Sequence, residues 1–395
     1  MFIDALKHRY HLLFGKTWSP WVAGFLLGVT NVFLFAYAKP WTTFDGVLNW
    51  GNNILGFLGI YDGEIASPLL YSSSLLNWSL ILGATIAALF ANEFGLRMAP
   101  TLEMIKAVIG GIFMGIGANL AMGCNIGGFF SSVSALSLSG FAMMLGLMVG
   151  AFLGIRYLLW ETEKLPQRLQ PKAVPSEEPK KARSKIIQPI VGLIMLTGVI
   201  VLALTVDYAY AEHTSWSTFF LFGIFLGIVN QRSRFCFVKA FREPFLTGDG
   251  KMTQAVIIAL ITGVIGFSIV KWTLMETVID KIYMGVRPTF WIGGLLGGVI
   301  FGFGMSLTGG CASGSMWRAG EGHIKLWVAL LTFSISGATF QHYLRSNGLA
   351  EKLGEAIFFP DILSWKLALI VSLGILSLWS LFVTWNEVKG RFSAL

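Results

Sequence analysis

Charged residues are scarce in this chain. Only 13% of its 395 residues are Asp, Glu, Lys or Arg, whereas a typical soluble domain has about 25%. Hydrophobic residues make up 55% of the chain, and its mean hydropathy is +0.69. This balance excludes a soluble enzyme and a secreted disulfide-linked domain. It predicts an all-α polytopic membrane protein that crosses a lipid bilayer many times.

The net charge of +8 does not indicate a nucleic-acid partner. Basic residues gather between the apolar runs, in the N-terminal arm, in 161–185, in 231–242 and in the tail, while 40–74 contains no Lys or Arg. Cytoplasmic segments of membrane proteins carry such an excess of Lys and Arg. We therefore predict an inner-membrane protein with both termini in the cytoplasm and 40–74 outside.

Cysteine is nearly absent, with three residues, Cys124, Cys236 and Cys311. An odd number of widely separated cysteines is not a disulfide framework, and none stands near a histidine at metal-binding spacing. We therefore expect no metal, no cofactor and no enzymatic activity. Residues 1–16 are polar and basic, without the apolar core of a cleavable signal peptide.

Long apolar runs are abundant. Runs of about 20 residues match the length of a membrane-spanning helix. Ten spans are predicted, at about 20–38, 75–93, 102–122, 139–159, 186–206, 216–236, 253–272, 289–308, 324–343 and 365–386.

One segment, 161–185, has a different composition. It holds seven Lys or Arg, four Glu and four Pro, which cannot form a packed core, so we predict a solvated cytoplasmic linker. The predicted organisation is an arm at 1–19, a first transmembrane repeat at 20–160, the linker at 161–185, an inverting transmembrane helix at 186–206, a second repeat at 216–345, and a terminal helix and tail at 365–395.

An internal repeat relates the two halves. Residues 110–124 read GGIFMGIGANLAMGC and residues 297–311 read GGVIFGFGMSLTGGC, which share seven positions; earlier in each half, 24–31 matches 223–230. The predicted spans place the matched helices in opposite directions across the membrane. This predicts two inverted-topology repeats, an arrangement typical of transporters with a site near the bilayer midplane.

Each repeat copy ends in a glycine-rich Gly-Cys motif. Gly123, Cys124 and Asn125 form the first, and Gly310, Cys311 and Ser313 belong to the second. Glycine at this density disfavours a continuous helix, so we predict broken or re-entrant helices. The free N–H groups at the start of the following helix would attract an anion. A lone buried cysteine is usually a small hydrophobe, but two at equivalent positions favour a functional role.

Charged residues accompany the other cysteine positions. Arg232 and Arg234 precede Cys236, and Arg318 and Glu321 follow Cys311. These charges either fix the orientation of interfacial loops or line a substrate pathway. An Arg318–Glu321 ion pair is sterically possible at this spacing of three residues.

Together these motifs resemble the YeeE/YedE family of membrane proteins, which take up inorganic reduced-sulfur compounds, thiosulfate above all. The resemblance rests on QRSRFC at 231–236 followed by AFR at 240–242, on GGCASG at 309–314 running into WRAGEG at 317–322, and on GCNIG at 123–127. The half that holds Cys124 comes first, which is closer to the YedE branch, linked to selenium metabolism.

The resemblance implies that the three cysteines hand the anion across the membrane, with Cys124 outermost, Cys311 in the middle and Cys236 toward the cytoplasm. It also implies a small cytoplasmic sulfur carrier of the sulfurtransferase type as partner. A thiol in an apolar surround stays protonated, so it donates a weak hydrogen bond and does not repel a dianion. Weak contacts at successive stations suit transport.

Three hypotheses follow from the sequence. The first is uptake of thiosulfate or a similar reduced-sulfur anion. The second is import of a selenium compound by the same path. The third is a membrane oxidoreductase that uses thiols, which the sequence disfavours because no adjacent cysteine pair is evident.

Overall fold

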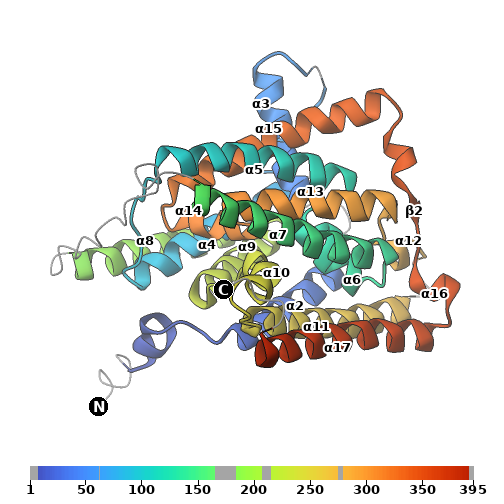
Figure 1. The fold of residues 1–395 in the computed structure, drawn as a ribbon. Coiled ribbons are helices and arrows are strands. Elements are labelled where there is room, and N and C mark those ends of the chain that lie inside the picture. The colour runs from blue at the N-terminus through green and yellow to red at the C-terminus, as the bar shows by residue number, and fades with distance from the viewer. Residues whose placement is uncertain (1–7, 62, 165–183, 207–214, 275–278, 391–395) are drawn as a thin grey trace.

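The computed structural model describes residues 8–61, 63–164, 184–206, 215–274 and 279–390, and these are almost entirely helical (Figure 1). Most of the predicted linker, 165–183, lies outside the described residues. Its first residues, 161–164, belong instead to the end of a long helix, in which Glu161 is 5% exposed and contacts Lys106 at 3.2 Å.

The first half contains η1 (His11–Gly15), α2 (Pro20–Tyr37), α3 (Phe44–Phe57), α4 (Ser72–Phe90), α5 (Thr101–Leu120), η2 (Asn125–Phe130), α6 (Ser131–Ser134) and α7 (Leu138–Lys164). Then follow α8 (Ser184–Thr205), α9 (Trp216–Ser233), α10 (Phe237–Leu246), α11 (Lys251–Leu274), α12 (Ile279–Tyr283), β1 (Pro288–Phe290), α13 (Ile292–Thr308), α14 (Ala312–Gly320), α15 (Ile324–Ser346), η3 (Ala350–Leu353), β2 (Glu355–Ala356), α16 (Phe359–Ile362) and α17 (Trp365–Lys389). The two short strands pair antiparallel.

Membrane crossing is indicated by the length and composition of the helices. Within the described ranges, nine helical segments are long and apolar enough to span a bilayer. The predicted span at 216–236 is not among them, because α9 ends in the polar sequence Asn230-Gln231-Arg232-Ser233. Nevertheless α9 packs along α4, where a Cβ on Gly227 would lie 2.1 Å from the Leu80 carbonyl oxygen. The chain is a multi-pass membrane protein.

Two glycine-rich helices, α5 and α13, form the centre of the bundle and run antiparallel. A Cβ on Gly110 would lie 2.7 Å from the Gly304 carbonyl oxygen, and one on Gly117 would lie 2.7 Å from that of Gly297. These distances leave no room for any larger residue. The repeated glycines therefore allow close backbone approach, as expected for small residues in membrane helices.

Long helices of one half also pack against long helices of the other half. Glycine residues lie at the close contacts of α2 with α11, α4 with α9, α5 with α15 and α7 with α13. Reciprocal packing of this kind is what two halves of opposite orientation would produce. We therefore propose that the two halves are inverted repeats.

Two short helices, α3 and α10, occupy equivalent places in the two halves. The sequence predicts a loop over 40–74, but α3 forms within it and buries Phe44, Val47 and Trp50. Helix α3 packs against α15, and α10 packs against α7 and α11. At 14 and 10 residues these helices are too short to be recognised as membrane spans.

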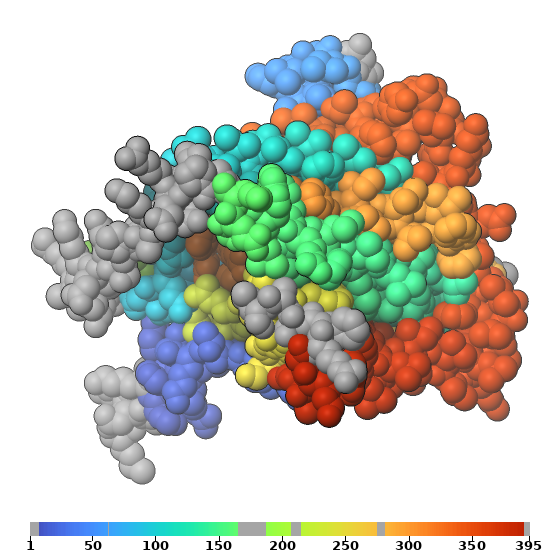
Figure 2. Space-filling view, viewed as in Figure 1, coloured from blue at the N-terminus to red at the C-terminus, as the bar shows by residue number. Residues whose placement is uncertain are grey.

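The outer surface of the bundle is apolar. Helices α5, α7 and α17 form much of the face seen in Figure 2. Their exposed side chains include Ile109 on α5, Leu145 and Val149 on α7, and Leu381 on α17. An apolar surface of this extent is expected where lipid tails take the place of water.

Candidate functional site

The first Gly-Cys motif interrupts its helix as predicted. Helix α5 ends at Leu120, Met122 takes a positive φ of 47°, and Cys124 caps the following helix η2 with φ −79° and ψ −174°. The backbone N–H of Ile126 donates to the Cys124 Sγ at 3.4 Å. A Cβ on Gly123 would lie 2.4 Å from the Gly128 nitrogen, so only glycine fits this turn.

The second motif makes the same corner. Helix α13 ends at Thr308, Gly309 has φ 76°, and Cys311 caps α14 with φ −78° and ψ −175°. The backbone N–H of Gly314 donates to the Cys311 Sγ at 3.3 Å, and the Ser313 hydroxyl lies 3.7 Å from the same sulfur. The two cysteines therefore share one backbone conformation, which we call the Cys124 corner and the Cys311 corner.

Each corner sulfur lies beside a side chain from the residue that immediately precedes a short helix. The Thr43 Oγ1 lies 2.8 Å from the Cys124 Sγ and immediately precedes α3. Cys236 immediately precedes α10, and its thiol lies beside the Cys311 thiol: a Cβ on Gly314 would lie 3.1 Å from the Cys311 Sγ and 3.6 Å from the Cys236 Sγ. Thr43 is thus the structural counterpart of Cys236, whereas the sequence offset of the earlier repeat points to Tyr37. No sequence motif singled out Thr43.

Cys236 is buried beside the Cys311 corner. The sequence predicts it at a cytoplasmic span end, next to Arg232 and Arg234. Its side chain is only 1% exposed, and its sulfur and that of Cys311 both lie next to Gly314. Cys236 and Cys311 therefore form one buried thiol pair rather than two separated stations.

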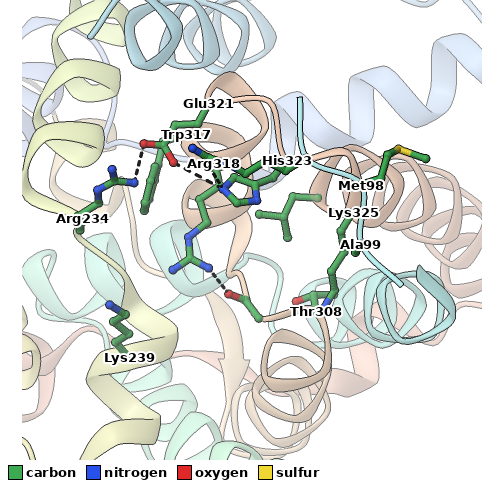
Figure 3. A pocket seen from close by; sticks show the side chains of 13 residues that line it. Met98, Ala99, Arg234, Lys239, Thr308, Trp317, Arg318, Glu321, His323 and Lys325 are labelled. Atoms are coloured by element: carbon green, nitrogen blue, oxygen red, sulfur yellow. Dashed lines mark hydrogen bonds and ion pairs between the residues drawn. The ribbon is translucent and has the colours of Figure 1, made fainter. Parts of the chain in front are cut away.

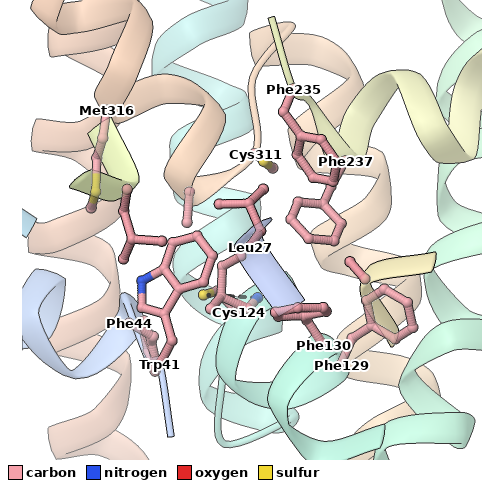
Figure 4. Close-up of a cluster of buried hydrophobic side chains, with 14 of the residues drawn as sticks. Leu27, Trp41, Phe44, Cys124, Phe129, Phe130, Phe235, Phe237, Cys311 and Met316 are labelled. Carbon is pink, nitrogen blue, oxygen red and sulfur yellow. Dashed lines mark hydrogen bonds between the residues drawn. The ribbon is translucent and has the colours of Figure 1, made fainter. Parts of the chain in front are cut away.

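Apolar side chains separate the two corners. In Figure 4, Leu27 lies between the Cys124 and Cys311 sulfurs, and the rings of Trp41, Phe130 and Phe237 surround them. Cys124 and Cys311 are both 0% exposed and belong to one continuous buried cluster. The two corners therefore lie within one buried apolar cluster.

A basic cavity of about 420 Å³ lies beside the Cys311 corner (Figure 3). We call it the Arg318 cavity. Its polar lining consists of Arg97, Arg234, Lys239, Thr308, Arg318, Glu321, His323 and Lys325, with the Trp317 ring and the backbone of Gly309. Arg318 Nη1 donates to the Gly309 carbonyl oxygen at 2.7 Å, two residues before Cys311. Five cations and one carboxylate give the cavity a strong positive potential.

The Arg318–Glu321 ion pair that the sequence spacing allows does not form. Glu321 instead accepts from Arg234 Nη1 at 2.6 Å and from Gln231 Nε2 at 2.8 Å. Arg232, 1% exposed, contacts Glu93 at 3.1 Å and donates to the backbone carbonyl oxygens of Phe14 and Lys16. Arg232 therefore ties the N-terminal segment to the bundle and does not line the cavity.

His323 is neutral in this setting. Burial is the main cause that lowers the pKa of His323 to about 4, and the nearby cations Arg97, Arg318 and Arg234 lower it further. Arg97 Nη1 lies 3.0 Å from the His323 Nε2, and since a guanidinium only donates, this nitrogen accepts. The histidine adds no charge to the cavity at neutral pH.

A second cavity, of about 230 Å³, lies at the opposite end of α5. We call it the Arg287 cavity. Its polar lining consists of Asp45, Asn119, Arg287, Gln341 and Arg345. Met122 also lines it, two residues before Cys124, just as Gly309 lines the Arg318 cavity two residues before Cys311. The sequence pointed to neither Arg287 nor Arg345.

The structure therefore brings the predicted residues together in two groups. Gly123, Cys124 and Asn125 form one corner, and Gly310, Cys311 and Ser313 form the other together with Cys236. Arg318 and Arg234 line the neighbouring cavity. Among the described residues, no group of three His, Cys, Asp or Glu side chains is placed to hold a metal ion.

Comparisons with known proteins agree with this architecture. The family model described as sulphur transport matches residues 5–153 and 232–393, which is more than half of the chain. The chain is 29% identical to the probable transporter YedE of Escherichia coli strain K12 over 354 residues, covering 85% of this chain and 83% of that protein. It is 33% identical to the thiosulfate transporter TsuA of the same strain over 180 residues, covering 42% of this chain and 46% of the relative.

A second thiosulfate transporter TsuA, from Spirochaeta thermophila, is 36% identical over 115 residues, covering 29% of this chain and 33% of that protein. The partial coverage of both TsuA proteins contrasts with the nearly full-length match to YedE. The chain belongs to the sulphur transport family, the YeeE/YedE family of membrane proteins.

Proposed function

We propose that this protein imports thiosulfate or a similar reduced-sulfur anion across the inner membrane. The anion enters at the Arg287 cavity, passes the Cys124 corner, then the Cys311 corner with Cys236, and leaves through the Arg318 cavity. The observation that carries the proposal is the matched geometry of the two corners. Each presents a buried thiol two residues from an arginine-lined cavity, and the two cavities lie at opposite ends of α5.

The hydrogen bonds at each corner suit weak, transient binding. A backbone N–H donates to each sulfur, and we propose that the thiol proton is donated to a passing anion. A thiol is a weak donor, and the hydroxyl of Thr43 adds a stronger one at the Cys124 corner. Several weak contacts move an ion onward, because no single site holds it too tightly to release.

Transport requires the apolar barrier to open. Leu27, Trp41 and Phe130 separate the corners and offer no charge to a dianion. Transporters built from inverted repeats alternate access by rocking one half against the other around a fixed site. The reciprocal packing of α5, α7, α13 and α15 supplies two halves of that kind.

Sidedness follows from the basic residues. The Arg318 cavity lies near the start of α5 and beside the basic segment 231–242, which the positive-inside rule places in the cytoplasm. Both termini are proposed to be cytoplasmic on the same ground. A small sulfurtransferase-type carrier that accepts the anion at the Arg318 cavity is the proposed partner.

Growth on thiosulfate tests the proposed function. A host that lacks sulfate uptake should grow on thiosulfate when it expresses this protein, and should not grow with the empty vector. A variant with Cys124→Ala and Cys311→Ala, at equal membrane abundance, is the matched control. Selenite or selenate given in excess should leave that growth unchanged if sulfur is the substrate. Strong competition at equal concentration would favour the selenium alternative.

The thiol pair gives an oxidoreductase a specific observation in its favour. The Cys236 and Cys311 sulfurs lie side by side over Gly314, which the sequence did not show. Oxidation to a disulfide would release two protons and two electrons, which require an electron acceptor. Transport that persists in Cys236→Ser, with its remaining thiols held reduced, would exclude this activity as the source of growth.

A further inference from the structure

Each corner cysteine is followed by a short helical segment whose far end lies on a long helix of the other half. Residues 125–135, which comprise η2, α6 and the residue after it, follow Cys124, and α14 follows Cys311. We call them the Cys124 segment and the Cys311 segment. Helix α6 packs against α11, and α14 packs against α4. The last carbonyl oxygens of a helix have no partner within it, so they need a donor from elsewhere.

At the end of the Cys124 segment the donor is a lysine from α11. Lys271 Nζ donates to the Ala135 carbonyl oxygen at 2.8 Å, although the two residues are 136 positions apart. Lys271 is 0% exposed, and its ammonium lies 4.6 Å from the centroid of the Phe358 ring. It forms no ion pair with a carboxylate among the described residues. An ionisable side chain buried within a membrane protein is costly, which makes a functional role the first hypothesis.

At the end of the Cys311 segment the donor is a threonine from α4. Thr85 Oγ1 lies 2.9 Å from the Gly320 carbonyl oxygen, 235 positions away. The same hydroxyl lies 2.9 Å from the Ile81 carbonyl oxygen, so its single proton is shared between two acceptors. A Cβ on Gly320 would lie 2.6 Å from the Ile81 carbonyl oxygen, so this segment lies directly on α4.

Helices α4 and α11 occupy equivalent places in the two halves. The matched sequences 24–31 and 223–230 lie in α2 and α9, and α2 packs on α11 whereas α9 packs on α4. Lys271 and Thr85 are therefore counterparts. Each comes from the half that does not carry the cysteine whose segment it holds.

The backbone connects the halves in the same way just beyond each segment. After the Cys124 segment, the N–H of Phe359 donates to the Leu136 carbonyl oxygen at 2.9 Å. After the Cys311 segment, the N–H of Arg97 donates to the Gly322 carbonyl oxygen at 2.9 Å. Both pairs join opposite halves of the chain, so a movement of one half would displace the corner that the other half carries.

We propose that Lys271 and Thr85 are positioning residues, which fix the Cys124 corner and the Cys311 corner, respectively, to the opposite half of the protein. The use of this coupling to move an anion rests on the proposed function; the anchoring of the corners does not. Lys271 is the stronger anchor, because its charge strengthens the hydrogen bond to Ala135 and is attracted to the face of the Phe358 ring.

Thiol labelling of each corner tests the two anchors separately. Two single-cysteine forms of the full chain in lipid nanodiscs, one with Cys124 and one with Cys311, react with N-ethylmaleimide, which reaches a buried thiol only when its corner opens. We expect Lys271→Met to speed labelling of Cys124 about tenfold and Thr85→Val to speed labelling of Cys311 about threefold, as for the loss of a charged and of a neutral hydrogen bond. Each variant should leave the labelling of the other corner unchanged.

A conservative variant and a matched control complete the design. Lys271→Gln keeps an N–H donor, so its Cys124 labelling should lie closer to that of the unchanged protein than to that of Lys271→Met. Ser268→Ala removes a buried hydroxyl on the same helix that donates within α11, to the Val264 carbonyl oxygen, so labelling should not change. In uptake assays with all cysteines present, Lys271→Met should lower the maximal rate more than it raises the half-saturating concentration, because the thiol is kept and only its position is changed.

The outcomes separate these anchors from the proposed function. Equal acceleration at both corners by Lys271→Met, or unchanged labelling of Cys124, would overturn the anchor at Lys271. Labelling of Cys124 as fast in Lys271→Gln as in Lys271→Met would do the same. Thr85→Val carries the corresponding test if Lys271→Met does not reach the membrane. Corner-specific labelling in a protein that imports no thiosulfate would support the anchors and refute the proposed function.

Discussion

The Cys124 corner and the Cys311 corner share a backbone and differ in what surrounds it. At the Cys124 corner a hydroxyl, from Thr43, lies beside the sulfur, whereas at the Cys311 corner a second thiol, from Cys236, does so. The Arg318 cavity is bordered by the ion pairs of Arg234, and its Arg97, Lys239 and Arg318 form no ion pair with a carboxylate among the described residues. On the proposed function, this combination of equal backbones and unequal side chains would let one fold bind an anion at one end and release it at the other.

The hydrogen-bond donors at the two corners differ in strength. A hydroxyl is a stronger hydrogen-bond donor than a thiol. This contrast places the tighter contact at the Cys124 corner and the weaker one at the Cys311 corner. Such an order favours capture on the proposed external side and release on the proposed cytoplasmic side.

The largest expected effect comes from the shared part of the two corners. Cys124→Ala and Cys311→Ala should each abolish thiosulfate-supported growth, because each removes the thiol that faces the path. Membrane abundance, measured by immunoblot, should be unchanged. Normal growth of either variant would contradict a relay that needs both corners.

Thr43 tests what is particular to the Cys124 corner. Thr43→Val keeps the shape and removes the hydroxyl, so uptake at low thiosulfate should fall roughly tenfold, as expected for the loss of a hydrogen bond of about 1.4 kcal/mol. Thr43→Ser should retain most uptake. Thr30→Val is the matched control, since the Thr30 hydroxyl bonds only within α2, to the Leu26 carbonyl oxygen.

Replacing Cys236 with threonine gives the Cys311 corner the hydroxyl that Thr43 supplies at the Cys124 corner. Cys236→Thr should slow release and lower the maximal uptake rate several-fold, because a stronger donor would then face Cys311. Cys236→Ala should reduce uptake less than either corner alanine variant, since Cys311 remains. If Cys236→Thr behaved like the unchanged protein, the thiol pair would have no part in release.

Removing an arginine charge should change the free energy of unfolding differently at the two cavities. Arg234→Gln should lower the free energy of unfolding by about 2 kcal/mol, because it leaves the buried Glu321 carboxylate without its charged partner. Arg287→Gln should leave unfolding nearly unchanged, because Arg287 has no carboxylate partner to lose. Thermal unfolding in detergent measures both. Equal destabilisation would mean that Arg287 is structural.

Much of the architecture could be predicted from sequence because long apolar runs identify membrane helices. Apolar length located the described spans, and the Gly-Cys motifs located both helix breaks, since glycine density opposes a continuous helix. Helices α3 and α10 were missed because they are short and mix polar with apolar residues. Apolar length alone does not identify helices this short.

The side-chain contacts could not be predicted from the sequence. Thr43 meets Cys124 across 81 positions, and Arg287 reaches Gly127 from the second half of the chain. The spacing allows an Arg318–Glu321 ion pair, but Arg318 donates to the Gly309 carbonyl oxygen and Glu321 pairs with Arg234. Such choices depend on how the halves pack, which no local motif records.

The smallest expected effect is a pH dependence confined to the Cys311 corner. The pKa of His323 is about 4, below its ordinary value of 6.5, because it is partly buried among arginines. Between these two values the unfolded chain takes up a proton that the folded chain refuses, so stability should fall as pH is lowered from 6.5 toward 4. His323→Gln should lessen the fall in unfolding temperature between pH 7 and pH 5, while uptake near neutral pH should hardly change. No histidine lines the Arg287 cavity among the described residues, so Arg287→Gln should keep the full fall. An equal fall in His323→Gln and the unchanged protein would show that another group carries the acid sensitivity.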